Sequence, residues 1–311
     1  MDRLYEHLCG FDAEAWRRAV DTLAAEIHPI DQNATRIWFA FYPLELHLAI
    51  EAAGADAERR FGLMGKWRLA DQVDASHRFL YGHRYWPQVK TAIQQFEGPL
   101  GALAPLIAAV ADHATRTARV DRDQLIGPAA VGLMTLRQAG APAFAAAPGA
   151  LQVSPEARRQ SPHQILGRRA RDDSQGLMGF LGGTKKWTVT FDENDPAAAF
   201  RCIDGQELAS AAQSDKRDYH LRDRRCTPGE GPIPVECRAA SCGTCWVGVL
   251  GGAEKLSPVS DRDEGRRMKV FGYSDTNEPN PLLRLSCQAR AFGAVSVVIP
   301  PWNGIWGKVK A

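Results

Sequence analysis

The sequence predicts an α+β chain with two domains, of which the first is all helical and the second mixes strands with short helices. Three observations support this prediction. Apolar residues recur at helical spacing over residues 1–140. Residues 141–183 are rich in Ala, Pro, Gly and Arg, which is typical of a linker. Residues 184–311 contain runs in which apolar and polar side chains alternate, which is the period of strands.

The helical domain is predicted from apolar spacing together with helix-end signals. Residues 11–28 place apolar side chains at i, i+4 and i+8, with acidic residues early in the run. Residues 33–53 predict a second helix, with Asn33 or Thr35 as the N-cap and a kink or break at Pro43. Further helices are predicted at 87–96, 103–117 and 121–138, the last with Gly127-Pro128 as a candidate break.

The second domain is predicted from strands and one short helix. Residues 185–191, with the sequence KKWTVTF, place Trp187, Val189 and Phe191 on one face of a strand. We expect a partner strand, a short helix and two later strands at 198–202, 207–213, 246–250 and 294–299, respectively.

Composition and charge exclude several classes of protein. Hydrophobic residues make up 45% and charged residues 24% of the chain, as in a globular protein with a sizeable core. The formal net charge is only +2, so we expect no nucleic acid as the main partner. No apolar run is long enough to predict a transmembrane segment. The N-terminus is polar and lacks the pattern of a signal peptide, so we expect a cytoplasmic protein.

Four of the seven cysteines form the pattern that carries chemistry. Cys237, Cys242 and Cys245 lie in CRAASCGTC with the spacing C-x4-C-x2-C, and 41 residues separate Cys245 from Cys287. This is the ligand spacing of a plant-type 2Fe–2S cluster. The residues between the first three cysteines are small, and Gly243 above all lets the backbone wrap closely. Inward N–H groups can then donate to the sulfurs and stabilise the reduced state.

Residues 185–303 resemble the plant-type 2Fe–2S ferredoxin family, with the most specific similarity at CRAASCGTC. The resemblance implies the β-grasp fold and a 2Fe–2S cluster as cofactor. It also implies one iron near the surface, bound by Cys237 and Cys242, and an inner iron bound by Cys245 and Cys287. Arg238 matches the arginine that usually follows the first cysteine of the family. The other cofactor-binding residues that the resemblance implies are Ser241, Gly243 and Thr244.

Two features depart from simple ferredoxins. The stretch between Cys245 and Cys287 is longer, with the extra length at 257–281, and a second insertion falls at 215–232. Residues 185–311 hold 18 Lys and Arg against 16 Asp and Glu, whereas simple ferredoxins are strongly acidic. This charge balance argues against the reductase-type partners that acidic ferredoxins use.

Other interpretations of the cysteines and histidines stay open. Four thiolates also suit a structural zinc site, although zinc knuckles favour paired C-x2-C spacings and one such pair is present. Cys226 is either an ordinary loop cysteine or, through nearby arginines, a redox-responsive thiol. His47 with Glu51 and the nearby Glu45, and His77 with His83, are either ordinary core or surface residues or ligands of a haem or second metal in the helical domain. Cys202 is expected to lie in the core.

The function that these observations favour is one-electron transfer. We expect an electron carrier with a 2Fe–2S cluster that serves an oxidoreductase and is not an enzyme by itself. Its helical domain would dock it to a larger redox complex, and its partners would be a redox donor and a redox acceptor. The alternatives are an oxidoreductase subunit with a second cofactor in the helical half, a redox sensor, and a subunit in which the cluster only stabilises the fold.

Overall fold

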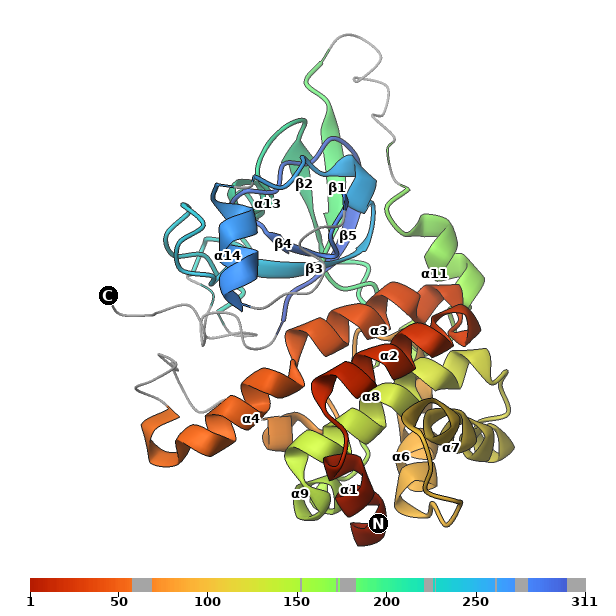
Figure 1. The fold of residues 1–311 in the computed structure, drawn as a ribbon. Coiled ribbons are helices and arrows are strands. Elements are labelled where there is room, and N and C mark those ends of the chain that lie inside the picture. Colours follow the sequence, from red (N-terminus) through yellow and green to blue (C-terminus); the bar gives the residue numbers. More distant parts are fainter. Residues whose placement is uncertain are drawn as a thin grey trace. The chain divides into compact units, whose positions relative to one another are not determined.

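The computed structural model of the chain describes residues 1–57, 69–151, 153–171, 173, 183–220, 226, 228–260, 262–271 and 279–300 (Figure 1). The chain divides into two compact units, one formed by residues 1–52 with 67–162 and the other by residues 53–66 with 163–311. The first unit is helical, and the second contains a mixed sheet. Among the helices of the described residues, none has both the length and the apolar character needed to cross a membrane.

The helices of the first unit pack around α8 (Asp123–Ala139), whose residues 125–138 are all buried. Its neighbours include α3 (Pro29–Phe41), α6 (Trp86–Gln94) and α7 (Leu103–Ala118). Gly132 lets α6 approach closely, because a Cβ atom there would lie 2.7 Å from Cδ1 of Ile93. Also present are α1 (Asp2–Cys9), α2 (Ala13–Leu23), α4 (Leu44–Ala53), α9 (Ala141–Ala146) and α10 (Pro155–Arg158).

The N-cap expected at Asn33 or Thr35 is wrong, because α3 begins earlier in the chain. His28 caps this helix, and its ring Nδ1 accepts a hydrogen bond from the backbone N–H of Ile30 at 3.2 Å. Pro29 is the first helical residue, where its fixed φ suits a helix and its missing N–H leaves no bond unmade. The residues with the stronger capping preference therefore lie inside the helix.

Of the two breaks considered at prolines, one is confirmed. α3 ends at Phe41 and α4 begins at Leu44, so Pro43 separates two helices. α8 instead continues through Gly127-Pro128. Both residues are buried, and packing around α8 offsets the hydrogen bond that a proline removes from a helix.

The described part of the second unit is built on a five-stranded sheet with the order β2-β1-β5-β3-β4 (Figure 1). β1 and β5 pair in parallel at its centre, and the other neighbouring strands are antiparallel. Trp187 and Val189 are the buried side chains of β1, as the alternation predicts. The strands are β1 (Lys186–Thr190), β2 (Ala199–Ile203), β3 (Trp246–Gly251), β4 (Leu283–Leu285) and β5 (Val295–Val298).

Most elements of this unit confirm the prediction with small shifts of their ends. The four predicted strands are β1, β2, β3 and β5, and the predicted short helix is α13 (Leu208–Ala212). The prediction lacks α11 (Pro162–Arg168), the short 3-10 helix Ala253–Lys255, and two elements close to the last cysteine. The helix α14 (Glu264–Phe271) lies in the insertion at 257–281, and β4 follows directly after that insertion.

A segment of the second unit that precedes the first strand is folded against the sheet. We call residues 168–173, as far as they are described, the upstream strap. Arg169 forms a buried ion pair with Glu193, in which Nε and Nη2 each lie 2.7 Å from a carboxylate oxygen. Asp173 accepts a hydrogen bond from the backbone N–H of Ala294 at 2.7 Å. Part of the predicted linker is therefore folded onto the sheet, and another part forms α9 and α10.

Candidate functional site

Two paired strands bring together the ends of the cysteine motif. β3 begins at Trp246, directly after Cys245, and β4 ends at Leu285, two residues before Cys287. These strands are antiparallel neighbours. The N–H of Ser286 donates to the carbonyl oxygen of Cys245 at 3.0 Å, which continues the ladder beyond the strand ends. This register brings Cys287 beside Cys245.

The cysteine loop, residues 237–245, contains three residues with left-handed backbone. Arg238, Ala240 and Gly243 have φ angles of 56°, 56° and 70°. Glycine adopts this conformation readily, whereas a residue with a Cβ atom is destabilised by roughly 1–2 kcal/mol. The loop therefore holds strain at two positions, and strain of this kind is concentrated at functional sites.

Backbone N–H groups of the loop point at its sulfurs. The N–H groups of Ala239 and Cys242 donate to Sγ of Cys237 at 3.4 Å and 3.3 Å. The N–H of Thr244 donates to Sγ of Cys242 at 3.5 Å. Burial raises the pKa of the Cys237 thiol, but hydrogen bonds from the Ser241 hydroxyl and from these N–H groups outweigh burial and lower that pKa to about 7. The loop thus favours the thiolate, which is the form of cysteine that binds metals.

Cys245 and Cys287 form a second and more buried pair, with exposed fractions of 1% and 7%. A hydrogen bond between the two sulfur groups lowers the pKa of Cys287 to about 6, and the side-chain amide of Gln288 contributes to this shift. The same bond, together with burial, raises the pKa of Cys245. The backbone N–H of Ala240 also donates to Cys287, so the cysteine loop contacts the second pair directly.

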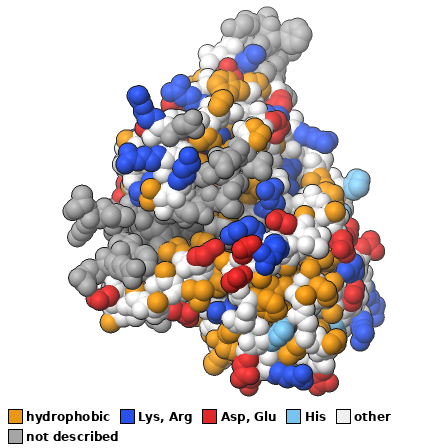
Figure 2. All heavy atoms as spheres, in the orientation of Figure 1, with side chains coloured by type: hydrophobic (Ala, Val, Ile, Leu, Met, Phe, Trp, Pro, Cys, Tyr) orange, Lys and Arg blue, Asp and Glu red, His pale blue; other side chains and the backbone are white. Residues whose placement is uncertain are grey.

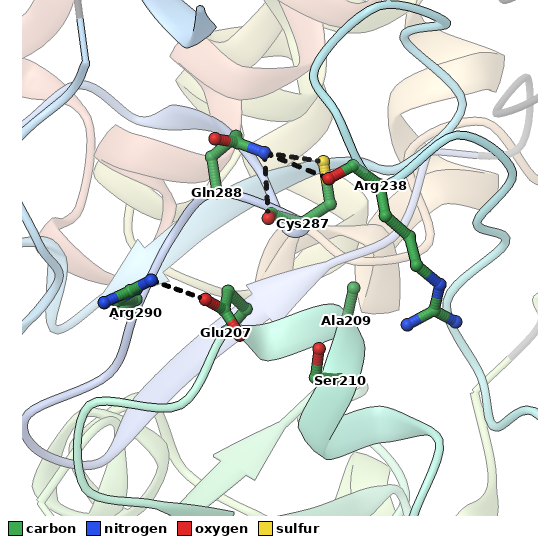
Figure 3. A pocket seen from close by; sticks show the side chains of 7 residues that line it. All are labelled: Glu207, Ala209, Ser210, Arg238, Cys287, Gln288 and Arg290. Atoms are coloured by element: carbon green, nitrogen blue, oxygen red, sulfur yellow. Dashed lines mark hydrogen bonds and ion pairs between the residues drawn. The ribbon is translucent and has the colours of Figure 1, made fainter.

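Gln288 joins the last cysteine to the cysteine loop (Figure 3). Its Nε2 donates to Sγ of Cys287 at 3.5 Å, to the carbonyl oxygen of Cys287 at 3.0 Å and to the carbonyl oxygen of Arg238 at 3.3 Å. Gln288 and Cys287 line a polar pocket of about 390 Å³. The other lining residues are Arg238, the Glu207–Arg290 ion pair, Ala209 and Ser210.

The inserted helix α14 contacts both the cysteine loop and β4. Arg267 Nη2 donates to the carbonyl oxygen of Cys242 at 3.3 Å. Glu264, in the first turn, is buried and accepts two hydrogen bonds from Arg284, each at 2.9 Å. The N–H of Leu285 donates to the same carboxylate at 2.6 Å. α14 therefore connects the two segments that carry the cysteines.

Sequence reasoning does not identify Gln288, Glu264 or Arg267 as part of the site. Gln288 directly follows Cys287, and this position beside a predicted ligand is the signal that could have found it. Glu264 and Arg267 lie in a strongly charged segment that is typical of a solvated surface. Their contacts depend on the fold of the insertion, which no local pattern predicts.

The arrangement of the sulfurs fits a binuclear cluster better than a zinc ion. A four-cysteine zinc site gathers its sulfurs around one ion. The sulfurs instead form two pairs, Cys237 with Cys242 and Cys245 with Cys287. Four thiolate donors with inward N–H groups are the donor set that a 2Fe–2S cluster requires.

Two cysteines outside the motif are buried. Cys202 lies in β2, where burial raises its pKa to about 12, and the expectation of a core cysteine is confirmed. Cys226 donates from Sγ to the carbonyl oxygen of Pro232 at 3.4 Å. The arginines expected to activate Cys226 fall at 222–225, outside the described residues.

His77 and His83 lie in the core of the first unit. Both are buried, and their ring centroids are 4.8 Å apart. Burial lowers the pKa of His83 to about 4 and the pKa of His77 well below its usual value, so both rings are neutral near pH 7. Trp86 packs on His77 with a centroid distance of 4.2 Å. The two histidines are therefore buried and neutral within the helical core.

Comparison with known proteins identifies the part of the chain that carries the cysteines. Residues 192–292 match the family model of the 2Fe-2S iron-sulfur cluster binding domain. The helical unit matches no family model, and neither a curated protein nor a solved structure matches the chain. The matched range contains all four cysteines of the motif together with α13, β3, α14 and β4. Residues 192–292 of this chain are therefore a 2Fe–2S iron–sulfur domain, and their cofactor is a 2Fe–2S cluster.

Proposed function

We propose that the chain is a one-electron transfer protein, or the electron-transfer subunit of an oxidoreductase, whose cluster is bound by Cys237, Cys242, Cys245 and Cys287. The observation that carries the proposal is the gathering of these four sulfurs into two adjacent pairs within the matched domain. A bound 2Fe–2S cluster supplies one-electron chemistry, with a potential that depends on net charge, hydrogen bonds to sulfur and exposure.

The proposed ligands differ in exposure, so one iron would lie nearer to solvent than the other. Cys237 and Cys242 are partly exposed, whereas Cys245 and Cys287 are buried. The first pair would hold the iron nearer to solvent, and the second pair would hold the inner iron. A partner therefore approaches most closely at Cys237 and Cys242, and we propose that electrons enter and leave on this side.

The remaining predicted site residues have roles in the loop that follow from their contacts. Ser241 and Thr244 supply hydrogen bonds to Cys237 and Cys242. Gly243 provides a left-handed turn. These hydrogen bonds disperse negative charge on the sulfurs and so raise the reduction potential. Arg238 is exposed beside Cys237 and adds positive charge at the edge of the site.

The sheet order and the parallel pairing of β1 with β5 support a β-grasp fold for the second unit. For the helical unit we propose a role in docking the protein to a larger redox complex, and for the whole protein a cytoplasmic location, where thiols stay reduced.

The test is anaerobic purification of the full chain, with iron, zinc and acid-labile sulfide measured beside the visible and paramagnetic resonance spectra. We expect equal amounts of iron and sulfide and a paramagnetic signal after reduction with dithionite. Cys242→Ser and Cys287→Ser should each change or abolish that signal, whereas the control variants Cys202→Ser and Cys226→Ser should keep it. Bound zinc without labile sulfide, or an unchanged cluster in Cys287→Ser, would overturn the assignment.

A further inference from the structure

The helix α14 presents a basic face to solvent next to the cysteine loop. Arg266 and Lys269 are exposed, and they flank Arg267, which contacts the carbonyl oxygen of Cys242. Arg262 is exposed in the turn that directly precedes the helix. The buried residues of the helix are Glu264, Gly265 and Met268.

Arg238 adds a further exposed cation from within the cysteine loop. Its side chain extends along one side of the pocket in Figure 3, away from the Glu207–Arg290 ion pair. Exposed acids on the same elements are Glu236 and Asp263. We define the basic rim as four exposed cations whose charged groups have no hydrogen-bond or ion-pair partner among the described residues: Arg238, Arg262, Arg266 and Lys269.

The charge of the site gives the basic rim a physical role. A 2Fe–2S cluster bound by four thiolates is negatively charged, so an acidic partner would be repelled from its edge. Cations within about one Debye length, roughly 8 Å at physiological salt, offset this repulsion locally. Figure 2 shows Lys and Arg side chains gathered over the face of the second unit where α14 lies, with few acidic side chains among them.

We propose that the basic rim docks the acidic surface of a redox partner protein and places it against the exposed pair Cys237 and Cys242. This inference rests on the proposed electron-transfer function. Val270, at the end of α14, is 65% exposed and gives the rim an aliphatic contact. A partner protein can bury such a side chain, whereas a nucleic-acid backbone is bound through its phosphate charges.

Two small oxidants of opposite charge probe the rim without knowledge of the partner. The full-length protein is first shown to contain labile sulfide and is then reduced with dithionite. Excess dithionite is removed, and the protein is mixed in a stopped-flow instrument with anionic cobalt(III)–EDTA or cationic hexaamminecobalt(III). One electron passes from the protein to each cobalt(III) ion, which becomes cobalt(II). The reaction is followed by the return of the visible absorbance.

We expect the anionic oxidant to react with a rate that falls as ionic strength rises, because the rim attracts it. In Arg266→Glu/Lys269→Glu this rate should fall about threefold or more at low salt, and the rate with the cationic oxidant should rise. The control Lys185→Glu/Lys186→Glu has the same change in net charge and lies at β1, far in sheet order from β4. It should change both rates less than twofold.

Equal effects of the two double variants, or no salt dependence with the anionic oxidant, would overturn the docking proposal while leaving the cluster assignment intact. Absence of labile sulfide would instead overturn the proposed function itself. A labelled DNA duplex serves as the competing probe at physiological salt. If the wild-type protein binds the duplex tightly and Arg266→Glu/Lys269→Glu does not, nucleic acid is the occupant of the basic rim and a protein partner is rejected. If both proteins bind the duplex equally weakly, the result supports a protein partner.

Discussion

Glu264 and Arg284 form a bidentate ion pair that is almost completely buried, with exposed fractions of 1% and 2%. Each of the two nitrogen–oxygen distances is 2.9 Å, and the backbone N–H of Leu285 donates a third hydrogen bond to the carboxylate. The pair joins α14 to the strand that leads to Cys287. One interaction thus holds together two elements that are absent from the prediction.

Removing one charge of this pair should destabilise the second unit. We expect Glu264→Gln to lower the free energy of unfolding by about 3 kcal/mol or more, because Arg284 would stay buried without its counter-charge. Urea unfolding of the cluster-loaded protein, followed by visible absorbance, measures the change. Glu254→Gln, at an exposed position, is the matched control and should change the free energy of unfolding by less than about 0.5 kcal/mol. A wild-type midpoint for Glu264→Gln would contradict the prediction.

Gln288 should tune the reduction potential through its hydrogen bond to Sγ of Cys287. The bond stabilises the extra negative charge of the reduced state, so Gln288→Leu should lower the potential by roughly 20–40 mV, the equivalent of roughly 0.5–1 kcal/mol. Gln288→Glu, which also adds a charge, should lower it further. Redox titration followed by visible spectra measures both. The control Gln213→Leu, at the end of α13, should leave the reduction potential unchanged. A raised potential in Gln288→Leu would refute the proposed effect of the Gln288 hydrogen bond.

The buried His83 should make the helical unit less stable in mild acid. Its ring is held neutral with a pKa of about 4, against 6.5 for an ordinary histidine. As the pH falls, the unfolded chain therefore binds a proton at this residue before the folded chain does. The contribution of neutral His83 to the free energy of unfolding is present above pH 6.5 and is lost as the pH falls toward 4. We expect this residue to lower the free energy of unfolding by about 1.6 kcal/mol between pH 6.5 and pH 5. Urea unfolding, followed by the circular dichroism of the helices, measures the free energy of unfolding at each pH. This free energy should depend less on pH in His83→Asn than in the wild type. An unchanged pH dependence would show that His83 is not its cause.

The ion pair between Arg169 and Glu193 should contribute to the stability of the sheet, although Arg169 lies ahead of the first strand. Its side chain is 8% exposed, so Arg169→Met would leave Glu193 nearly buried without a partner. We expect a loss of about 3 kcal/mol in urea unfolding of the second unit. Arg158→Met replaces an exposed arginine and should have almost no effect. Equal stability of the two variants would mean that the upstream strap is not part of the folded unit.

The features that could be predicted from the sequence are those with a local signature. The cysteine motif is recognisable because cluster ligation fixes its spacing. β1 is recognisable because Trp187 and Val189 alternate with polar neighbours, and the break at Pro43 follows from the chemistry of proline. In each case a few consecutive residues carry the information.

The features that could not be predicted depend on contacts between distant residues. β4 is a strand of three residues, and the centre of that strand is Arg284, whose burial is explained by Glu264 twenty positions earlier. α14 buries few apolar side chains, so its helical period is weak. The start of α3 at Pro29 was missed because His28 is a less common cap than Asn or Thr.

The parallel pairing of β1 with β5 has a consequence for biosynthesis. β5 fills the middle of the sheet between β1 and β3, yet it comes last in sequence among the described strands. Until β5 has been synthesised, the pair β2–β1 and the pair β3–β4 have no strand to join them. Stable incorporation of iron and sulfide should therefore follow synthesis of residue 298.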